Sequence, residues 1–326
     1  MFNGPLFLVG MPRSGTKLLR GLLNEHPQIG IPLNETEFYP DWRRRWATFG
    51  DLSDPARFDQ FYEAVTGSVY FVHRREEHGL QIDPRVWQRR CRSFSSQGVF
   101  EALVRHDADV PWDTPGVWGD KSPGYLVHLQ TLKADFPQAR FIHIIRDVRD
   151  YCLSMKTAFG KSMTRAAQRW RNRIEGARHV AHTFPDDYTE VRYEDLLADP
   201  TEEVERLCQF IGVDFSPEML ELSRAPENIG DARGRRTIKR DNAEKWRTKM
   251  DPGKRRLIER IAGDVLRSLE YPVETQGRCT VSRPHMLALQ IYDGLQLTRR
   301  QVQKRGVVEA IRFQARLFRE TRSGAG

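Results

Sequence analysis

The 326-residue sequence is poor in cysteine, and its longest apolar runs are too short to cross a membrane. No two of the four cysteines are close in the chain, and none stands near a histidine at zinc-ligand spacing. This speaks against a disulfide framework or a common zinc site and predicts reduced, mostly buried thiols. The N-terminus shows no secretory leader, so we expect a cytoplasmic location. The cysteines are Cys91, Cys152, Cys208 and Cys279.

Positive charge exceeds negative charge, with 52 Lys and Arg against 44 Asp and Glu and a net charge of +8. Such an excess indicates an anionic partner. The basic residues form local clusters, at 43–45, 89–92, 233–240 and 299–300, and no RNA-recognition, zinc-finger or helix-turn-helix pattern accompanies them. We therefore expect a multiply charged nucleotide cosubstrate and no nucleic acid, with a nucleic-acid-binding module as an alternative.

The most informative segment is the apolar run at 6–10, followed by a glycine-bounded loop and then by apolar residues at helical spacing. A strand, a tight loop and a helix in this order direct backbone N–H groups and a helix N-terminus at one point, where phosphate or sulfate-like groups bind. Gly10 and Gly15 keep the spacing of the nucleotide P-loop, but Thr16 precedes Lys17, which reverses the usual order. An ordinary glycine-rich turn is the alternative.

Strand-like and helix-like stretches alternate along most of the chain, which predicts an α/β fold with a parallel sheet covered on both faces. In such folds a ligand binds at the carboxyl ends of the strands. Four strands should end near Gly10, Gly119, Ile145 and Tyr193, so the segments after these residues should converge on one site. Expected strands are 6–10, 29–31, 117–119, 140–145 and 188–193. Expected helices are 14–25, 123–136 after a turn at 120–123, 148–157, 162–182 and one from 201.

Two regions depart from this alternation. Residues 34–116 are irregular and rich in aromatics and arginine, and predict helical segments and loops over a cleft that line an acceptor site with Trp42 to Trp46. After residue 271 a basic amphipathic helical pattern begins, which we expect to pack on the domain or on a second subunit of a homodimer. We therefore divide the chain into a domain at 1–271 and a C-terminal extension at 272–326. The apolar positions of the extension are Leu287, Ile291, Leu295, Val302, Ile311 and Phe318.

A second anion-binding segment begins where the 140–145 strand ends. Arg146 stands at that end, and Ser154 follows eight residues later, two turns along the next helix. An arginine at a strand end can grip a phosphate with two hydrogen bonds, and a hydroxyl can donate another. Each residue also has an ordinary explanation, because Arg146 could pair with Asp150 and Ser154 could bond to its own helix.

Together these segments resemble those of sulfotransferases that use 3′-phosphoadenosine-5′-phosphosulfate (PAPS). Pro12-Arg13-Ser14-Gly15-Thr16 resembles the 5′-phosphosulfate loop, and the pattern R-D-x-R-x-x-x-x-S from Arg146 to Ser154 resembles the 3′-phosphate segment. The motifs are most similar to the tyrosylprotein and bacterial branches. One departure is Ala158, which stands where the tyrosylprotein branch has a further arginine. The resemblance implies a P-loop-type parallel sheet flanked by helices, PAPS as donor and no metal.

The resemblance also implies catalytic roles. Glu35, shortly after a His-Pro pair, matches the general base of the tyrosylprotein branch, with Glu37 as second choice. Lys121 in Gly-Asp-Lys-Ser-Pro resembles the lysine that approaches the transferring sulfonate, and Arg13 would act beside it at the loop. No histidine stands in a matching context, and His143 lies within an apolar strand as a core residue.

The cofactor-binding residues implied by the resemblance come from four parts of the chain. Those in the last part, a charged segment near residue 240, could instead form a charged flexible lid. The implied residues are Arg13, Ser14, Gly15, Thr16, Lys17, Arg146, Ser154, Tyr193, Arg235, Arg236, Thr237 and Lys245.

The sequence therefore predicts transfer of the sulfuryl group of PAPS to a hydroxyl or amine, by in-line attack with a carboxylate base. The expected acceptor is a small molecule, a carbohydrate or a glycolipid, with no membrane span in the protein. A magnesium-dependent P-loop kinase is the other alternative, in which Thr16 and Asp147 would hold the metal. Arg146 at the strand end speaks against it.

Overall fold

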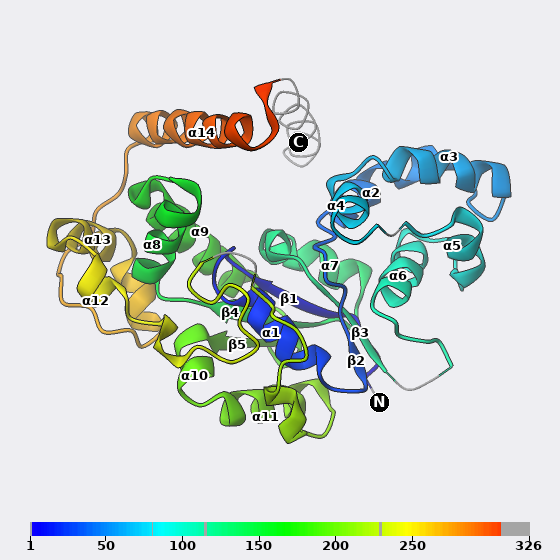
Figure 1. The fold of residues 1–326 in the computed structure, drawn as a ribbon, viewed down its shortest axis with the longest axis horizontal. Helices are drawn as coiled ribbons and strands as arrows, with labels where there is room; N and C mark the ends of the chain where they lie inside the picture. Colours follow the sequence, from blue (N-terminus) through cyan, green and yellow to red (C-terminus); the bar gives the residue numbers. More distant parts are fainter. Residues whose placement is uncertain (1, 80, 114–115, 228–229, 308–326) are drawn as a thin grey trace.

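Five short parallel strands form one sheet at the centre of the computed structural model (Figure 1), which describes residues 2–79, 81–113, 116–227 and 230–307. Their order across the sheet is β2-β3-β1-β4-β5, and every neighbouring pair is parallel. The predicted α/β class is confirmed. The strands are β1 Leu6–Gly10, β2 Ile29–Gly30, β3 Val117–Lys121, β4 Arg140–Ile145 and β5 Tyr188–Arg192.

Side chains of alternate residues along the strands enter two separate cores, one on each face of the sheet. In β1, Phe7 and Val9 join the larger core, whereas Leu6 and Leu8 join the smaller one, as the two-residue period of a strand requires. Helices α8 Val148–Phe159, α9 Met163–Ala181 and α13 Pro252–Ser268 cover the first face. Helices α1 Thr16–Asn24, α10 Tyr193–Ala198 and α11 Pro200–Ile211 cover the second.

Two strand ends differ from the sequence predictions. Strand β3 continues to Lys121, paired with Leu8 of β1, where a turn was expected. Pro123 keeps the preceding residue out of the helical region, so a 3₁₀ segment, η2 Pro123–Val127, precedes the short helix α7 Leu129–Asp135 in place of one helix. Tyr193 begins α10 and does not end the preceding strand.

Residues 34–116 are helical, as predicted, and lie at one side of the molecule (right in Figure 1). Their interior is aromatic: Trp42 stacks on Phe38 with ring centroids 4.1 Å apart and on Trp87 at 5.8 Å. Because Trp42 is 1% exposed, its predicted place in the lining of an acceptor site is wrong. The helices are α2 Tyr39–Arg45, η1 Trp46–Phe49, α3 Pro55–Val65, α4 Val69–His78, α5 Pro84–Arg90 and α6 Ser96–Asp107.

The C-terminal extension contains α14 Arg283–Arg305, which lies apart from the sheet (top of Figure 1). It is held through the buried Asp293, which accepts hydrogen bonds of 2.8 Å from the Ser162 N–H and from Arg165 Nη1. Its apolar residues Leu287 and Ile291 are about 60% exposed, so the expected packing of this face on the domain is wrong, and the homodimer stays a prediction. Ile311 and Phe318 lie outside the described residues.

The remaining elements are short, and several join the sheet to the C-terminal helices. They are η3 Pro185–Asp187, η4 Pro217–Leu220, η5 Arg240–Asn242 and α12 Trp246–Lys249. All four cysteines are free; Cys152 and Cys208 are buried, and the other two are half-buried. His143 is confirmed as a core residue, since its side chain is fully buried. Within the described ranges, no helix combines the length and apolar character needed to cross a bilayer.

Candidate active site

The loop between β1 and α1 is held in a tight turn by its own backbone. The Ser14 N–H donates to the Met11 carbonyl at 3.1 Å, and both Arg13 (φ 73°) and Gly15 (φ 96°) adopt left-handed conformations. Position 15 requires glycine, because a Cβ there would lie 2.3 Å from the Tyr193 ring. The turn places the N-terminus of α1 immediately after the loop, which is the geometry of an anion site.

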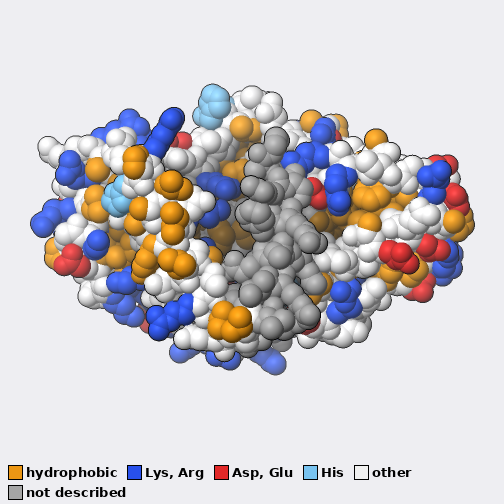
Figure 2. Space-filling view, turned by 90° about the horizontal axis from the view of Figure 1, so that it is seen from above, with side chains coloured by type: hydrophobic (Ala, Val, Ile, Leu, Met, Phe, Trp, Pro, Cys, Tyr) orange, Lys and Arg blue, Asp and Glu red, His pale blue; other side chains and the backbone are white. Residues whose placement is uncertain are grey.

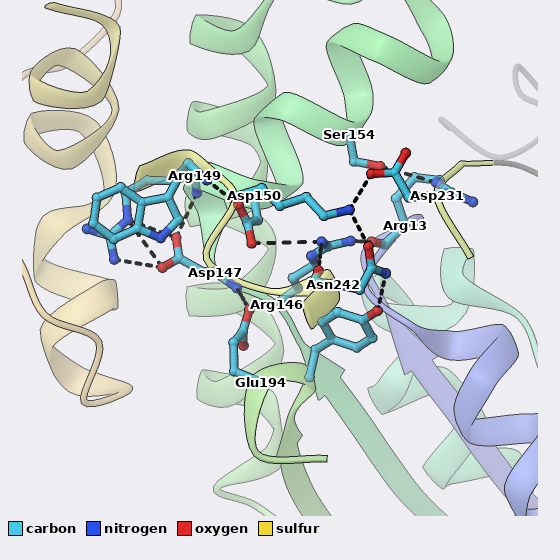
Figure 3. A network of polar contacts seen from close by, with 12 residues as sticks. Arg13, Arg146, Asp147, Arg149, Asp150, Ser154, Glu194, Asp231 and Asn242 are labelled. Atoms are coloured by element: carbon cyan, nitrogen blue, oxygen red, sulfur yellow. Dashed lines mark hydrogen bonds and ion pairs between the residues drawn. The ribbon is translucent and has the colours of Figure 1, made fainter. Parts of the chain in front are cut away.

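The two predicted anion-binding segments meet at Arg13 (Figure 3). Arg13 Nε donates to Ser154 Oγ at 3.3 Å, and Arg146 Nη1 donates to the Arg13 carbonyl at 3.2 Å. Arg146 is 6% exposed and its guanidinium lies 4.6 Å from the centre of the Tyr193 ring. Arg146 also forms the ion pair with Asp150 that the sequence allowed, with Nη2 3.8 Å from Asp150 Oδ2, so this alternative explanation of Arg146 stays open.

Three buried polar atoms at this junction lack a hydrogen-bond partner among the described residues. Two are possible donors, Ser14 Oγ at the loop and Arg146 Nε at the strand end, and the third is the acceptor Asp150 Oδ2. A buried donor without an acceptor is costly and is rare in folded proteins. An anion with several oxygens, such as a phosphate or sulfate ester, would satisfy both donors, so the residues present fit the cofactor that the sequence implies.

A network of buried charges begins directly after Arg146 in the chain, at Asp147 and Arg149 (Figure 3). The fully buried Arg149 donates to both oxygens of Asp147, at 3.0 and 2.6 Å, and to Glu259 at 2.8 Å. Its guanidinium lies 3.7 Å from the centre of the Trp246 ring. The Asp147 carboxylate is thus fully engaged, which speaks against the kinase alternative in which it would hold a metal.

The segment near residue 240 closes over this junction through Asn242. Its carbonyl accepts from Arg146 Nη2 at 2.8 Å, and its amide Nδ2 donates to the Tyr193 hydroxyl at 2.6 Å. Lys245 donates to Asn242 Oδ1 and, at 2.5 Å, to Asp231. The structure therefore brings Tyr193 and Lys245 to the junction. Arg235, Arg236 and Thr237 are exposed on the same segment and are not brought into this cluster.

Two residues at this junction were not singled out from the sequence. Asn242 belongs to the charged segment near residue 240. The signal that could have pointed to it is its position three residues before the predicted Lys245. Glu227 accepts from Arg13 Nη1 at 3.2 Å. No sequence pattern pointed to it, because a lone carboxylate in an irregular segment belongs to no motif with a defined spacing.

Lys121 and Glu35 form an ion pair at the carboxyl end of β3. The Lys121 side chain is fully buried, whereas the Glu35 side chain is 37% exposed. Burial lowers the pKa of Lys121, the Glu35 charge opposes that shift, and the charges of Arg20 and Lys17 lower the pKa further. Lys121 therefore lies near the residues that follow the anion-binding loop, with Glu35 between it and solvent.

Glu37, the second candidate base, has a different environment. Glu37 Oε1 accepts from the Gly124 N–H at 3.2 Å, at the start of η2. Between the two glutamates, Thr36 Oγ1 donates to the buried Asp120 at 2.5 Å. Burial raises the pKa of Asp120 to about 7. The Thr36–Asp120 bond fixes the segment so that Glu35 faces Lys121 while Glu37 faces η2.

A model of the sulfotransferase family matches residues 5–217, which is more than half of the chain. The chain belongs to the sulfotransferase family. It is 26% identical over 243 residues to a putative protein-tyrosine sulfotransferase of Caenorhabditis briggsae, covering 71% of this chain and 74% of the relative. It is 28% identical over 258 residues to omega-hydroxy-beta-dihydromenaquinone-9 sulfotransferase Stf3 of Mycobacterium bovis, covering 64% of this chain and 63% of the relative.

The fold of this sulfotransferase is similar to that of a solved sulfotransferase domain from the curacin biosynthetic pathway. The TM-score is 0.55 at 20% identity, and the match covers 84% of this chain and 99% of that domain. The chain spans only 58% of protein-tyrosine sulfotransferase 1 of Danio rerio, to which it is 25% identical. The family and the enzyme class predicted from the sequence are confirmed.

Proposed function

We propose that this sulfotransferase moves the sulfuryl group of PAPS to a hydroxyl or amine of its acceptor. The observation that carries the proposal is the junction at Arg13, where both anion-binding segments come within hydrogen-bond distance. The buried, unpartnered Ser14 Oγ and Arg146 Nε support it, because they match the oxygens of a doubly phosphorylated nucleotide.

The chain offers two anion positions. PAPS, when bound, supplies the sulfuryl group. The loop at 13–17, with its N–H groups and the start of α1, would hold the 5′-phosphosulfate. Arg146 and Ser154 would hold the 3′-phosphate, which requires Ser154 Oγ to donate to the phosphate while it still accepts from Arg13. Tyr193 and Lys245 would contact the nucleotide from the side of Asn242.

Glu35 and Lys121 have the properties that sulfuryl transfer needs at the acceptor end. Glu35 is solvent-accessible and faces a cation, so it can take the proton of an attacking hydroxyl or amine as the acceptor oxygen or nitrogen bonds to sulfur. Lys121 can stabilise the negative charge that grows on the departing phosphate, a contact typically worth about 2.7–4 kcal/mol in the barrier. Arg13 contributes positive charge at the same loop.

The acceptor carries a hydroxyl or amine, and its class is open to test. The names of two relatives state a protein tyrosine and an omega-hydroxy menaquinone derivative as their acceptors, and both present a hydroxyl. For this chain, a small-molecule, carbohydrate or glycolipid acceptor stays a prediction. The exposed side chains of 34–116 that face the Glu35–Lys121 pair would select it.

A calorimetric titration with PAP, the desulfated product, in parallel with ATP and without magnesium, tests the proposal. We expect PAP to bind in the micromolar range and ATP much more weakly. Arg146→Ala should weaken PAP binding by roughly 10- to 100-fold, because it removes charge-assisted hydrogen bonds. Arg178→Ala, whose arginine pairs with Glu190 away from the junction, is the control and should bind PAP normally. Absence of PAP binding would contradict the proposal, and so would ATP binding that becomes tight when the titration is repeated with magnesium.

A further inference from the structure

Helix α9 carries an unusual concentration of positive charge, with five arginines and one glutamate. Two of these arginines are neutralised: Arg171 pairs with Asp264 at 2.6 Å, and Arg178 pairs with Glu190 at 3.2 Å. The other three are spaced four residues apart and continue the spacing of a lysine just before the helix, so they lie along one face of α9. We call this set the basic ladder: Lys161, Arg165, Arg169 and Arg173.

The middle and far end of the basic ladder are not neutralised within the described part of the chain. Arg165 pairs with Asp293 of α14 at 2.8 Å, whereas no carboxylate of the described residues forms an ion pair with Arg169 or Arg173. Burial lowers the pKa of Arg173, and the charge of Arg169 lowers it further. Like charges four residues apart destabilise a helix by roughly 0.2–0.5 kcal/mol per pair, so the ladder is a cost to the fold.

The basic ladder runs toward the helices of 34–116. Burial lowers the pKa of His128, and the charges of Arg173 on α9 and Arg44 on α2 both lower it further, so each of these arginines lies near His128. Arg44 is partly neutralised by Asp41 at 3.3 Å. Figure 2 shows Lys and Arg side chains on both the α14 side and the α2–α6 side of this face. The ladder therefore crosses from the α14 side to the predicted acceptor side.

The other end of the basic ladder is close to the nucleotide junction in the chain. Lys161 follows α8, the helix that supplies Ser154, and all three arginines act electrostatically on the buried Tyr151, one turn before Ser154. A ligand on the ladder would thus lie beside the nucleotide site but on different residues, since none of the four belongs to the contacts at Arg13.

We propose that the basic ladder binds an anionic group of the acceptor, a phosphate or similar oxyanion, beside the sulfuryl-transfer site. The proposal rests on the proposed function, because it assigns the ladder to the acceptor. Guanidinium groups suit this ligand, since their planar N–H pairs match two oxygens of one phosphate. The phosphate can come from a lipid headgroup or from a free phosphorylated sugar, and both present the same oxyanion.

The test uses the full chain saturated with PAP, so that the nucleotide site is filled. It is titrated by calorimetry with glucose 6-phosphate against glucose, and by flotation with vesicles of phosphatidic acid against phosphatidylcholine. We expect the protein to bind one anionic probe but not its neutral match. The double variant Arg169→Gln/Arg173→Gln should weaken that binding roughly 10- to 100-fold. The matched control, Arg178→Gln on the same helix, should bind like the wild type, and both variants should keep the wild-type PAP affinity.

Binding of glucose 6-phosphate alone would support a free phosphorylated acceptor, and binding of phosphatidic acid vesicles alone would support a lipid one. Equal binding of anionic and neutral probes, or unchanged binding in the double variant, would overturn the proposal. So would binding that is lost in Arg146→Ala but kept in the double variant, because the probe would then occupy the nucleotide site. If PAP fails to bind while glucose 6-phosphate still depends on Arg169 and Arg173, the proposed function fails and anion binding by the ladder stands.

Discussion

The proposed nucleotide side of this sulfotransferase, at the Arg13 junction, and its proposed acceptor side, at residues 34–116, are built in different ways. On the nucleotide side, polar groups from distant parts of the chain contact one another directly, as Arg13, Ser154, Arg146 and Asn242 do. On the acceptor side, residues 34–116 are joined by stacked aromatic rings around Trp87, which is fully buried. The first arrangement brings polar groups to one point, where we propose that the nucleotide binds, and the second stabilises the packing of the helices.

This difference explains where the chemistry of the acceptor must be sought. Trp42 and Trp87 are at most 1% exposed, so they stabilise the helices from within the core. The side chains available to an acceptor are instead the charged ones at the surface, such as Arg44 and the basic ladder, and the Glu35–Lys121 pair. Aromatic richness in the sequence thus indicated packing, whereas we propose that the surface arginines recognise the acceptor.

The largest expected effect comes from removing Glu35, the group that we expect to act on the acceptor and not on the nucleotide. Glu35→Gln keeps the size of the side chain but cannot take a proton, so turnover with PAPS should fall by roughly 10²–10⁴-fold. PAP affinity, measured by calorimetry, should stay within about threefold of the wild type. Glu37→Gln is the matched control and should keep most of the turnover. Near-normal activity of Glu35→Gln would remove Glu35 as the base.

A truncation in the aromatic core tests whether the acceptor side is mainly a packing unit. Trp87 contacts Trp42, Phe58, Phe61 and Phe71, and Trp87→Ala should lower the free energy of unfolding by about 3–5 kcal/mol. Urea unfolding measures this loss. Trp112→Phe is a milder comparison, since Trp112 is only half-buried. A folded Trp87→Ala protein with wild-type stability would contradict the role of this core.

The sequence predicted the nucleotide side better than the acceptor side, for a physical reason. The loop that ends at Gly15 follows β1, and Arg146 follows β4. Because the carboxyl ends of parallel strands lie at one edge of the sheet, order along the chain predicts that these segments come together. Asn242 and Glu227 come from irregular segments, whose course depends on tertiary contacts that no local pattern records. For the same reason the course of Arg235 to Thr237 was not predictable.

On the acceptor side, the sequence indicated helices but not their role. The composition of 34–116, rich in aromatics and arginine, predicts helical segments and loops. The same aromatic residues suit a ligand pocket or a core, and only the packing of Trp42 on Trp87 decides between them. Likewise Lys121 was expected in a turn. It belongs to β3 because its backbone pairs with Leu8, and no local pattern predicts a pairing between segments so distant in the chain.

The pH dependence of the unfolding free energy gives a further test, at Asp120, which lies between the two sides. Its pKa is about 7 when folded and 3.8 as the ordinary value, so the folded protein binds the proton more tightly than the unfolded chain. The stability that the protonated Asp120 contributes is therefore lost as the pH rises from about 4 to about 7. Asp120→Asn does not lose this stability. The unfolding free energy of the variant minus that of the wild type should therefore rise by about 1–3 kcal/mol between pH 5 and pH 8.

Urea unfolding at both pH values measures the effect of Asp120→Asn. Asp186→Asn, at an exposed position of η3, is the control and should shift equally little at pH 5 and pH 8. An Asp120→Asn protein whose stability differs from the wild type by the same amount at both pH values would show that the carboxyl does not titrate in this range.

The smallest expected effect lies on the nucleotide side, at Ser154. Its hydroxyl is half-buried, accepts from Arg13 Nε at 3.3 Å and would donate to the 3′-phosphate, so Ser154→Ala removes one hydrogen bond to the ligand and loosens Arg13. A single hydrogen bond of this kind contributes roughly 0.5–1.5 kcal/mol, and PAP should bind about 2- to 12-fold more weakly by calorimetry. Thr157→Ala removes an exposed hydroxyl from the same helix and should bind PAP like the wild type. If Ser154→Ala also binds PAP like the wild type, Ser154 positions Arg13 at most, and Arg146 holds the 3′-phosphate without it.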